Sequence, residues 1–246
     1  MKVSMKRTLV VGDIHSGLKG LKQVIERAKI TSTDTLIFLG DYVDGWSEAA
    51  PTIQFLINLS KRQQCIFIKG NHDFWCEEYL RENIVNDTWL LHGGALTLDN
   101  YQRLSTEERT EHLAFLEGMK LYHIDAKNRL FIHAGFTSMK GPKQEFHQSN
   151  YFWDRTLWEM TLAMNNQIKL DSVYYPKRLK LFNEIYIGHT PTLHFDSFTP
   201  MNAANVWNLD TGAAFTGKLS IMDIETKEFW QSDSLPELYP TEKGRN

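Results

Sequence analysis

The hydrophobic positions in the first third of the chain follow two alternating periods. Short, uninterrupted apolar runs at residues 8–11, 35–39 and 66–68 predict buried strands. Between them, apolar residues recur every three or four positions over 18–28 and 51–60, which is the spacing of amphipathic helices. Strands that alternate with helices in this way favour an α/β domain with a parallel sheet.

The middle of the chain has a different pattern. Residues 74–120 are mostly helical in spacing, with a break at Gly93 and Gly94. The apolar runs 121–124 and 129–132 are close enough in sequence to predict a β-hairpin. A helix rich in aromatic residues is expected next, over 149–164.

The last third is expected to be mainly strands. One strand is predicted over 184–187, and three further runs predict an antiparallel meander with Asp210, Thr211 and Gly212 in its first turn. These three runs are 205–209, 218–224 and 228–231.

The whole pattern predicts an α/β fold in which two mixed β-sheets pack as a sandwich flanked by helices. No stretch rich in Pro, Gly or Ser separates two parts of the chain, so we expect a single domain over residues 1–235. Residues 236–246 are expected to form a loose C-terminal tail.

Composition excludes several classes of protein. The 246 residues include 27 Lys and Arg against 30 Asp and Glu, so the net charge of −3 gives no basic face for duplex nucleic acid. The apolar runs are far shorter than the roughly 20 residues of a membrane span. Cys65 and Cys76 cannot form a disulfide framework, and the first 15 residues lack a hydrophobic signal region. We therefore expect a cytoplasmic protein that binds no membrane.

Candidate chemistry appears where the strands end. Five predicted strands are followed directly by side chains that can bind a metal: Asp13 with His15, Asp41 with Asp44, Asn71 with His72, His133, and His189. Because ligands gather beyond the carboxyl ends of strands in α/β sheets, these side chains are expected to converge. Carboxylate, imidazole and amide donors without thiolate suit manganese, iron or zinc, and six donors are enough for two ions.

The motifs and their order resemble those of the calcineurin-like metallophosphoesterases. They are similar to the bacterial branch of the phosphoprotein phosphatases, which also includes the diadenosine tetraphosphatases. The resemblance extends from about residue 9 to residue 212 and rests on Gly12-Asp13-Ile14-His15, Gly40-Asp41-Tyr42-Val43-Asp44-Gly45, Gly70-Asn71-His72-Asp73, His133-Ala134-Gly135 and Gly188-His189-Thr190.

This resemblance implies two divalent metal ions, with manganese as the first expectation and iron or zinc as alternatives. The implied ligands are Asp13 and His15 on the first ion, Asp41 between both ions, and Asn71, His133 and His189 on the second. A hydroxide that bridges the ions would be the nucleophile. His72 would be the general acid that protonates the leaving oxygen, and Asp44 would orient its ring.

The sequence departs from the family pattern at one phosphate-binding position. Many members have an arginine directly after the second motif, where this chain has Gly45 followed by Trp46. A second arginine in bacterial relatives lies in a Trp-x-Arg context, so Arg155 in Trp153-Asp154-Arg155 is expected to bind phosphate. The missing arginine leaves specificity for phosphoproteins open.

Aromatic residues beside the motifs allow two interpretations. Trp46, Trp75 and Trp153 could form a stacking wall for a nucleobase, or they could form part of a hydrophobic lid or core. Asp73 and the 210–212 turn are interpreted as structural. Among the histidines outside the motifs, His92 lies in a glycine-containing loop that could approach the site.

The leading hypothesis is a dinuclear metal-dependent phosphoesterase most like a Ser/Thr protein phosphatase. The first alternative is a hydrolase of dinucleoside polyphosphates such as diadenosine tetraphosphate. The second is a non-catalytic binding scaffold on the same fold. A phosphorylated substrate, either a phosphoprotein or a nucleotide, is the expected partner, and the oligomeric state has no signature in the sequence.

Overall fold

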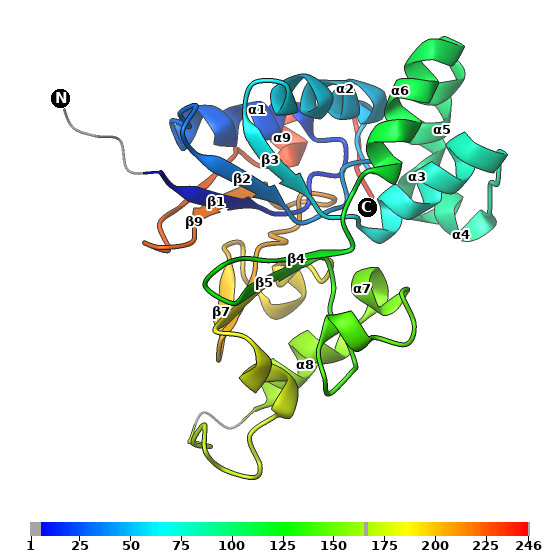
Figure 1. The fold of residues 1–246 in the computed structure, drawn as a ribbon. Coiled ribbons are helices and arrows are strands. Elements are labelled where there is room, and N and C mark those ends of the chain that lie inside the picture. Colours follow the sequence, from blue (N-terminus) through cyan, green and yellow to red (C-terminus); the bar gives the residue numbers. More distant parts are fainter. Residues whose placement is uncertain (1–5, 165–166, 246) are drawn as a thin grey trace.

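Two five-stranded sheets face each other in the computed structural model, which describes residues 6–164 and 167–245 (Figure 1). The first sheet has the order β10–β9–β1–β2–β3. Its strands are β1 (Thr8–Val11), β2 (Thr35–Phe38), β3 (Gln64–Phe67), β9 (Ser220–Asp223) and β10 (Phe229–Gln231). Strands β1, β2 and β3 are parallel, whereas β9 runs antiparallel to both β1 and β10.

The second sheet has the order β4–β5–β6–β8–β7. It consists of β4 (Tyr122–Ile124), β5 (Arg129–Ile132), β6 (Glu184–Ile187), β7 (Met201–Ala203) and β8 (Val206–Asn208). Strands β5, β6 and β8 are parallel, and the two edge strands are antiparallel to their neighbours. Both sheets are therefore mixed, and the predicted fold class is confirmed.

Helices cover the outer faces of the sandwich (Figure 1). The first sheet is covered by α1 (Leu18–Arg27), α2 (Ala49–Ser60) and α9 (Leu235–Leu238). At one end of it lie α3 (Asn71–Glu82), α4 (Asp87–Trp89), the π-turn η1 (Leu90–Gly94), α5 (Ala95–Gln102) and α6 (Thr106–Glu117). With the second sheet lie η2 (Pro142–Gln144), α7 (Asn150–Trp153), α8 (Thr156–Ala163), η3 (Lys177–Leu181) and η4 (Thr192–Phe195). None of the helices within the described ranges has the length and apolarity needed to cross a bilayer.

The core consists of three apolar layers, and the alternation of side chains along each strand creates them. Leu9 and Val11 of β1 point to the helices outside the first sheet, whereas Val10 points into the space between the sheets. There Val10 meets residues of the second sheet, including Phe131 and Tyr186, whose rings stack with centroids 5.0 Å apart. Because β1 is buried on both faces, the loop that follows it is held rigidly.

The predicted meander is correct for its last two strands, since β9 and β10 pair antiparallel, and wrong for its first. Strand β8 belongs to the second sheet, where it pairs in parallel with β6, whereas β9 and β10 belong to the first. Residues 209–219 carry the chain from one sheet to the other, so 205–209 and 218–224 are not neighbours. The apolar alternation of a strand identifies its buried face, but it does not identify which distant strand will be its partner.

The expected helix over 149–164 is divided into α7 and α8. The backbone of Asp154 is extended at the break, and its carboxylate accepts hydrogen bonds from the Thr156 amide at 2.9 Å and the Thr156 hydroxyl at 2.7 Å. This Asx-type capping begins a new helix, which changes the direction of the chain at Arg155. The aromatic periodicity did not reveal the break.

The segment 236–245 differs from the expected loose tail. Tyr239 is 2 % exposed, and its ring stacks on Trp46 with centroids 5.1 Å apart. The backbone amide of Ser47 donates to the Glu242 carboxylate at 2.9 Å, and the amide of Arg245 donates to the carbonyl of Ala214 at 2.8 Å. The partners of this segment are far away in sequence, which is why composition alone suggested disorder. Residue 246 lies outside the described residues.

Candidate metal centre

The candidate metal-binding side chains come from the loops that follow five strands, β1, β2, β3, β5 and β6. These strands run parallel within their sheets, so their carboxyl ends lie at one edge of the sandwich. The six expected donors at that edge are all buried: Asp13, His15, Asp41, Asn71, His133 and His189. The fold thus brings together side chains that are up to 176 positions apart in sequence.

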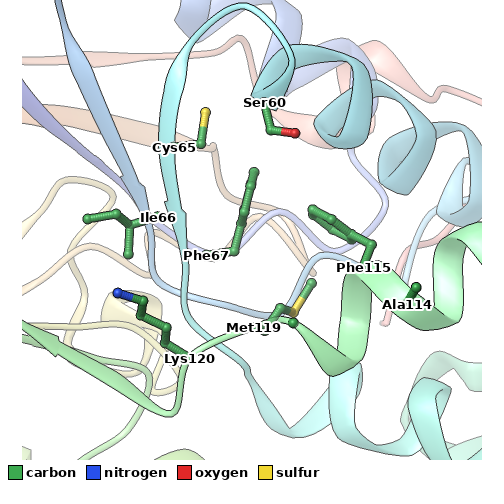
Figure 2. Close-up of a pocket in the computed structure, with 9 residues that line it drawn as sticks. Ser60, Cys65, Ile66, Phe67, Ala114, Phe115, Met119 and Lys120 are labelled. Carbon is green, nitrogen blue, oxygen red and sulfur yellow. The ribbon is translucent and has the colours of Figure 1, made fainter.

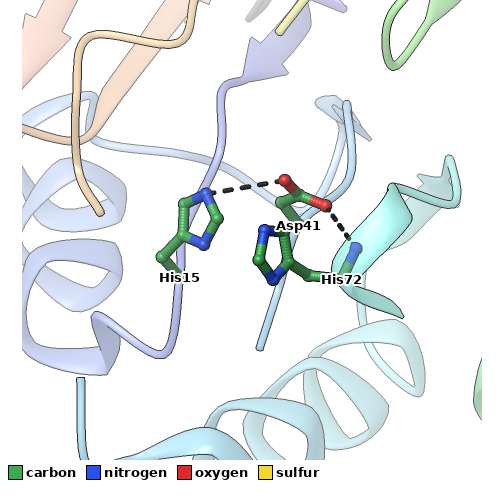
Figure 3. Close-up of side chains that lie close together, drawn as sticks. All are labelled: His15, Asp41 and His72. Carbon is green, nitrogen blue, oxygen red and sulfur yellow. Dashed lines mark hydrogen bonds and ion pairs between the residues drawn. The ribbon is translucent and has the colours of Figure 1, made fainter. Parts of the chain in front are cut away.

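The first group of donors lies around one oxygen of Asp41. Nε2 of His15 is 3.5 Å from Asp41 Oδ2 and 3.9 Å from Asp13 Oδ2. Figure 3 shows the Asp41 carboxylate between a ring nitrogen of His15 and the backbone amide of His72, which donates to Asp41 Oδ1 at 3.1 Å. Donors that bind one ion at about 2.0–2.2 Å are themselves roughly 3–4 Å apart, so this spacing suits a metal.

The second group shares the same aspartate. Nε2 of His133 is 3.4 Å from Asp41 Oδ2 and 3.2 Å from Asn71 Oδ1, and Nδ1 of His189 is 3.0 Å from that same amide oxygen. Asp41 belongs to two clusters whose ligand atoms all lie within 4.8 Å of one another, one with His15 and His72 and the other with His133 and His189. The arrangement can hold two ions with Asp41 in contact with both.

Unpaired polar atoms support the same interpretation. Asp13 Oδ1, His15 Nδ1 and His189 Nε2 are buried and have no hydrogen-bond partner among the described residues. A buried polar atom without a partner costs about 1–3 kcal/mol, and it is rare for three to lie in one place. A cation beside Asp13 would compensate the cost of its Oδ1, whereas His15 and His189 face the other donors with Nε2 and Nδ1, so it is the chemistry and spacing of the donors that fit a metal centre.

The pKa values of the buried donors are shifted in different directions, because burial and the neighbouring charges act differently on each of them. Burial and the nearby charge of Asp210 raise the pKa of Asp13, and burial lowers the pKa of His15 and of His189. Burial opposes a charge on His133, but Asp41 overcomes it and raises the pKa of that imidazole to about 10. A bound cation would favour carboxylate and neutral imidazole at every one of these positions.

Backbone geometry places these donors. His15, Asp41 and His189 have φ values of +48°, +53° and +68°, which is the left-handed region that residues other than glycine seldom occupy. A Cβ atom on Gly188 would overlap Asp13 Oδ1, and one on Gly70 would overlap Asp41 Oδ1. These two glycines are therefore required because the carboxylates pack directly against their Cα atoms.

Asp73 supports the loop after β2. Its carboxylate accepts hydrogen bonds from the backbone amides of Asp41, Tyr42 and Gly70, each at 2.8 Å. Burial and the charge of Asp41 raise the pKa of Asp73 to about 7. All three bonds hold backbone, which is the structural role expected for Asp73.

His72 and Asp44 form a pair beside the first group. Nδ1 of His72 is 2.5 Å from Asp44 Oδ2, and both residues are buried. Asp44 also accepts hydrogen bonds from the Trp89 indole at 2.8 Å and the Thr97 hydroxyl at 2.6 Å, so its carboxylate is fixed. With Nδ1 held by Asp44, the other ring nitrogen of His72 is available to donate a proton to a bound ligand.

A cavity of about 120 Å³ opens above these donors. Besides Asp41, Asn71, His72 and His189, its lining residues are Trp75, His92, Trp153, Arg155 and Arg245. Pockets for whole drug-sized ligands are larger, roughly 300–1,000 Å³, so this cavity suits the reacting group of a substrate. The remainder of the substrate would lie outside it.

The tryptophans beside the motifs have separate positions. Trp46 is fully buried away from the cavity, and its indole donates to the carbonyl of Ala213 at 2.7 Å. Trp75 and Trp153 both line the cavity, and Trp75 stacks on His92 with ring centroids 6.2 Å apart. Two of the three tryptophans thus form an aromatic wall, and the third is part of the core.

Arg155 lies at the cavity as the sequence predicts, but Arg245 was not anticipated. It belongs to the segment that was expected to be loose. The sequence signal for this residue is the pair Gly45-Trp46. Gly45 leaves space where many family members have an arginine, and a large aromatic residue follows it. Nothing in that pair identifies the segment that fills the gap.

A larger cavity of about 370 Å³ lies at the edge of β3, between that strand and α6. Figure 2 shows the rings of Phe67 and Phe115 pointing toward each other there, with centroids 4.8 Å apart. Burial raises the pKa of the Cys65 thiol to about 12, so this lining thiol is a poor nucleophile. The lining residues offer no convergent donors, and the candidate site remains the one at the strand ends.

Comparisons with known proteins agree with this geometry. A family model described as calcineurin-like phosphoesterase matches residues 6–208. The bis(5'-nucleosyl)-tetraphosphatase PrpE [asymmetrical] of Halalkalibacterium halodurans is 25 % identical, with 96 % of this chain and 97 % of that protein covered. The protein of the same name from Bacillus cereus (strain 03BB102) is 23 % identical, with 87 % and 88 % covered.

Two solved structures show the same fold. A metallophosphoesterase from Sphaerobacter thermophilus gives a TM-score of 0.57 at 14 % identity, with 96 % of this chain and 94 % of that chain covered. A protein serine/threonine phosphatase from Saccharomyces cerevisiae gives a TM-score of 0.62 at 11 % identity, with 94 % and 81 % covered.

Proposed function

This chain belongs to the calcineurin-like phosphoesterase family, and from that membership we propose that it is a dinuclear metal enzyme that hydrolyses phosphoesters. The observation that supports this proposal best is the position of Asp41 between two groups of donors, beside the pair His72–Asp44. A scaffold without catalytic activity would have no need for a general acid held by a carboxylate next to a complete set of donors.

We assign the first ion to Asp13 and His15, the second to Asn71, His133 and His189, and both to Asp41. When bound, two divalent cations lower the pKa of water and neutralise charge on the phosphoryl oxygens. His72 protonates the leaving oxygen, and Asp44 keeps its ring in the required tautomer and orientation. Arg155, at the cavity wall, donates hydrogen bonds to the phosphoryl group.

As the first candidate substrate we propose a phosphomonoester of the kind that Ser/Thr protein phosphatases hydrolyse. The small cavity supports this choice, because it accommodates a phosphoryl group and leaves the peptide outside. Trp153, which is 40 % exposed at the cavity wall, favours a second candidate, a dinucleoside polyphosphate, because an exposed aromatic ring beside a phosphate site can stack on a base. The names of the PrpE relatives support the same candidate.

We propose manganese as the resident metal, with iron or zinc as alternatives, because the donors are carboxylate, imidazole and amide without thiolate. We also propose a cytoplasmic location, since Cys65 and Cys76 are both free thiols, as is usual in a reducing compartment.

The test compares substrates on protein of known metal content. Purified protein loaded with Mn²⁺ should contain about two ions per chain and hydrolyse p-nitrophenyl phosphate. Rates on a phosphoserine peptide and on diadenosine tetraphosphate then separate the two candidates, and a clear preference for the dinucleotide would replace the first with the second. A folded protein that binds no metal and hydrolyses none of the three would favour the binding scaffold.

A further inference from the structure

Arg245 reaches the cavity from a segment that follows the last metal donor, His189, by 56 positions. One amino group of its guanidinium donates to Nδ1 of His92 at 3.1 Å, and the guanidinium lies over the ring of Phe215, with its carbon 5.3 Å from the centroid. Its Nε atom is buried and has no hydrogen-bond partner among the described residues. The contacts named here are with the imidazole of His92 and the phenyl ring of Phe215. Neither group carries a negative charge, so the guanidinium charge is available to an anion in the cavity.

Two glycines provide the space for the arginine. A Cβ atom on Gly45 would lie 3.6 Å from Arg245 Cγ, and one on Gly93 would lie 3.2 Å from the same atom. Both glycines have left-handed φ values, +108° and +100°, which other residues rarely adopt. A Cβ atom at position 45 would thus already be in van der Waals contact with the stem of Arg245, so the space beside Gly45 is occupied by this arginine.

The residue after Gly45 anchors the segment that carries Arg245. Trp46 is covered by the ring of Tyr239, and a Cβ atom on Gly244 would lie 2.8 Å from the Trp46 ring. The Ser47 amide and hydroxyl both donate to the Glu242 carboxylate, at 2.9 and 2.7 Å. The same short stretch therefore leaves a gap at the cavity and holds the segment that fills it.

We propose that Arg245 is a phosphate-binding residue, which supplies in this chain the guanidinium that is absent at position 45. With Arg155 it provides two cationic groups at the cavity wall, and each can donate paired N–H groups to phosphoryl oxygens. The inference rests on the proposed function, because the anion it binds is the phosphoryl group of the substrate. It adds a residue far outside the motifs to the substrate-binding site.

The experiment measures the affinity of the metal-loaded full-length protein for inorganic phosphate by calorimetry, together with KM for p-nitrophenyl phosphate. Arg245→Ala should weaken phosphate binding and raise KM about 10- to 100-fold, which is the usual value of a charge-assisted hydrogen bond. Metal content should be unchanged. Arg245→Gln keeps much of the stem without the charge, and it should lose as much affinity as the alanine variant.

Arg62→Ala is the matched control, because Arg62 is exposed in the turn between α2 and β3 and its removal changes the net charge equally. This control should bind phosphate within about twofold of the unchanged protein. If Arg245→Gln also binds phosphate within about twofold while its metal content is normal, the inference is wrong. If the unchanged protein hydrolyses no phosphoester, the proposed function fails instead, and calorimetry still reports whether Arg245 binds the anion.

Discussion

The role assigned to Asp44 can be tested with a substitution that removes its charge and preserves its shape. In Asp44→Asn the amide oxygen can still accept hydrogen bonds from His72 and Trp89, because both donate to the same oxygen, Oδ2. The new NH₂ group then faces the Thr97 hydroxyl, which can accept from it. The bonds from His72 and Trp89 therefore survive, the direction of the bond to Thr97 is reversed, and the main loss is the negative charge next to the His72 ring.

The size of the effect follows from that loss. A hydrogen bond to a charged group contributes about 1.5–3 kcal/mol and one between neutral groups about 0.5–1.5 kcal/mol. The midpoints of these ranges differ by about 1.3 kcal/mol, which corresponds to nearly tenfold in rate if the bond acts on the protonated ring in the transition state. Unfolding should be affected less, because His72 and Trp89 keep their acceptor and only the Thr97 hydroxyl proton loses one.

The assay compares kcat on two substrates with different leaving groups. Phenyl phosphate needs protonation of its leaving oxygen, so Asp44→Asn should lower its kcat about tenfold. The p-nitrophenolate group leaves easily, so for p-nitrophenyl phosphate the loss should be less than about threefold. Metal content should not change.

Trp89→Phe is the matched control, because it removes the other donor to Asp44 Oδ2 and leaves the His72 contact in place. It should lower stability but keep the ratio of the two kcat values. An equal loss on both substrates in Asp44→Asn, or a loss of metal, would refute the orienting role.

Three further predictions test other parts of the structure. Asp41→Asn should reduce bound metal from about two ions per chain to fewer than one, measured by elemental analysis, because both groups of donors share Asp41; unchanged content would contradict that sharing. Gly188→Ala should displace the Asp13 carboxylate and lower metal content and kcat at least about tenfold, whereas Gly20→Ala in α1, where a Cβ atom has room, should change neither. Hydrogen bonds from Lys127 and Arg129 lower the pKa of Glu225 to about 2, so its contribution to stability is present above its ordinary pKa of 4.5 and is lost as the pH falls through 2. Denaturant unfolding of Glu225→Gln should therefore differ from the unchanged protein at pH 6 and converge with it near pH 2; an equal difference at both pH values would contradict this.

The parts of the fold that the sequence predicts best are those in which neighbours in sequence are neighbours in space. The strands at 8–11 and 35–39 and the helix between them follow directly from the periodicity of their apolar residues. The hairpin of β4 and β5 is another example, since only four residues separate its strands. The sheet membership of β8 and β9 could not be predicted, because their partners β6 and β1 are about 20 and more than 200 positions away.

The candidate site likewise has a part that local sequence predicts and a part that depends on distant contacts. Its metal donors each follow a strand within a few residues, so local motifs and the rule about strand ends are enough to predict that they converge. Arg245 has no motif around it, and its position depends on the stacking of Tyr239 on Trp46, nearly 200 residues apart. Long-range packing of this kind leaves no periodic trace in a single sequence.

The docking of residues 236–245 on Trp46 also has a consequence for synthesis of the protein. A chain emerges from its N-terminus, so the donors from Asp13 to His189 are all available before the segment that closes the cavity wall is made. A nascent chain halted near residue 235 would already contain every proposed metal ligand, but its cavity would lack Arg245 and the surface of Trp46 would be uncovered. Completion of the binding site thus depends on residues 236–245, which are made after every proposed metal ligand, so metal binding can precede substrate binding.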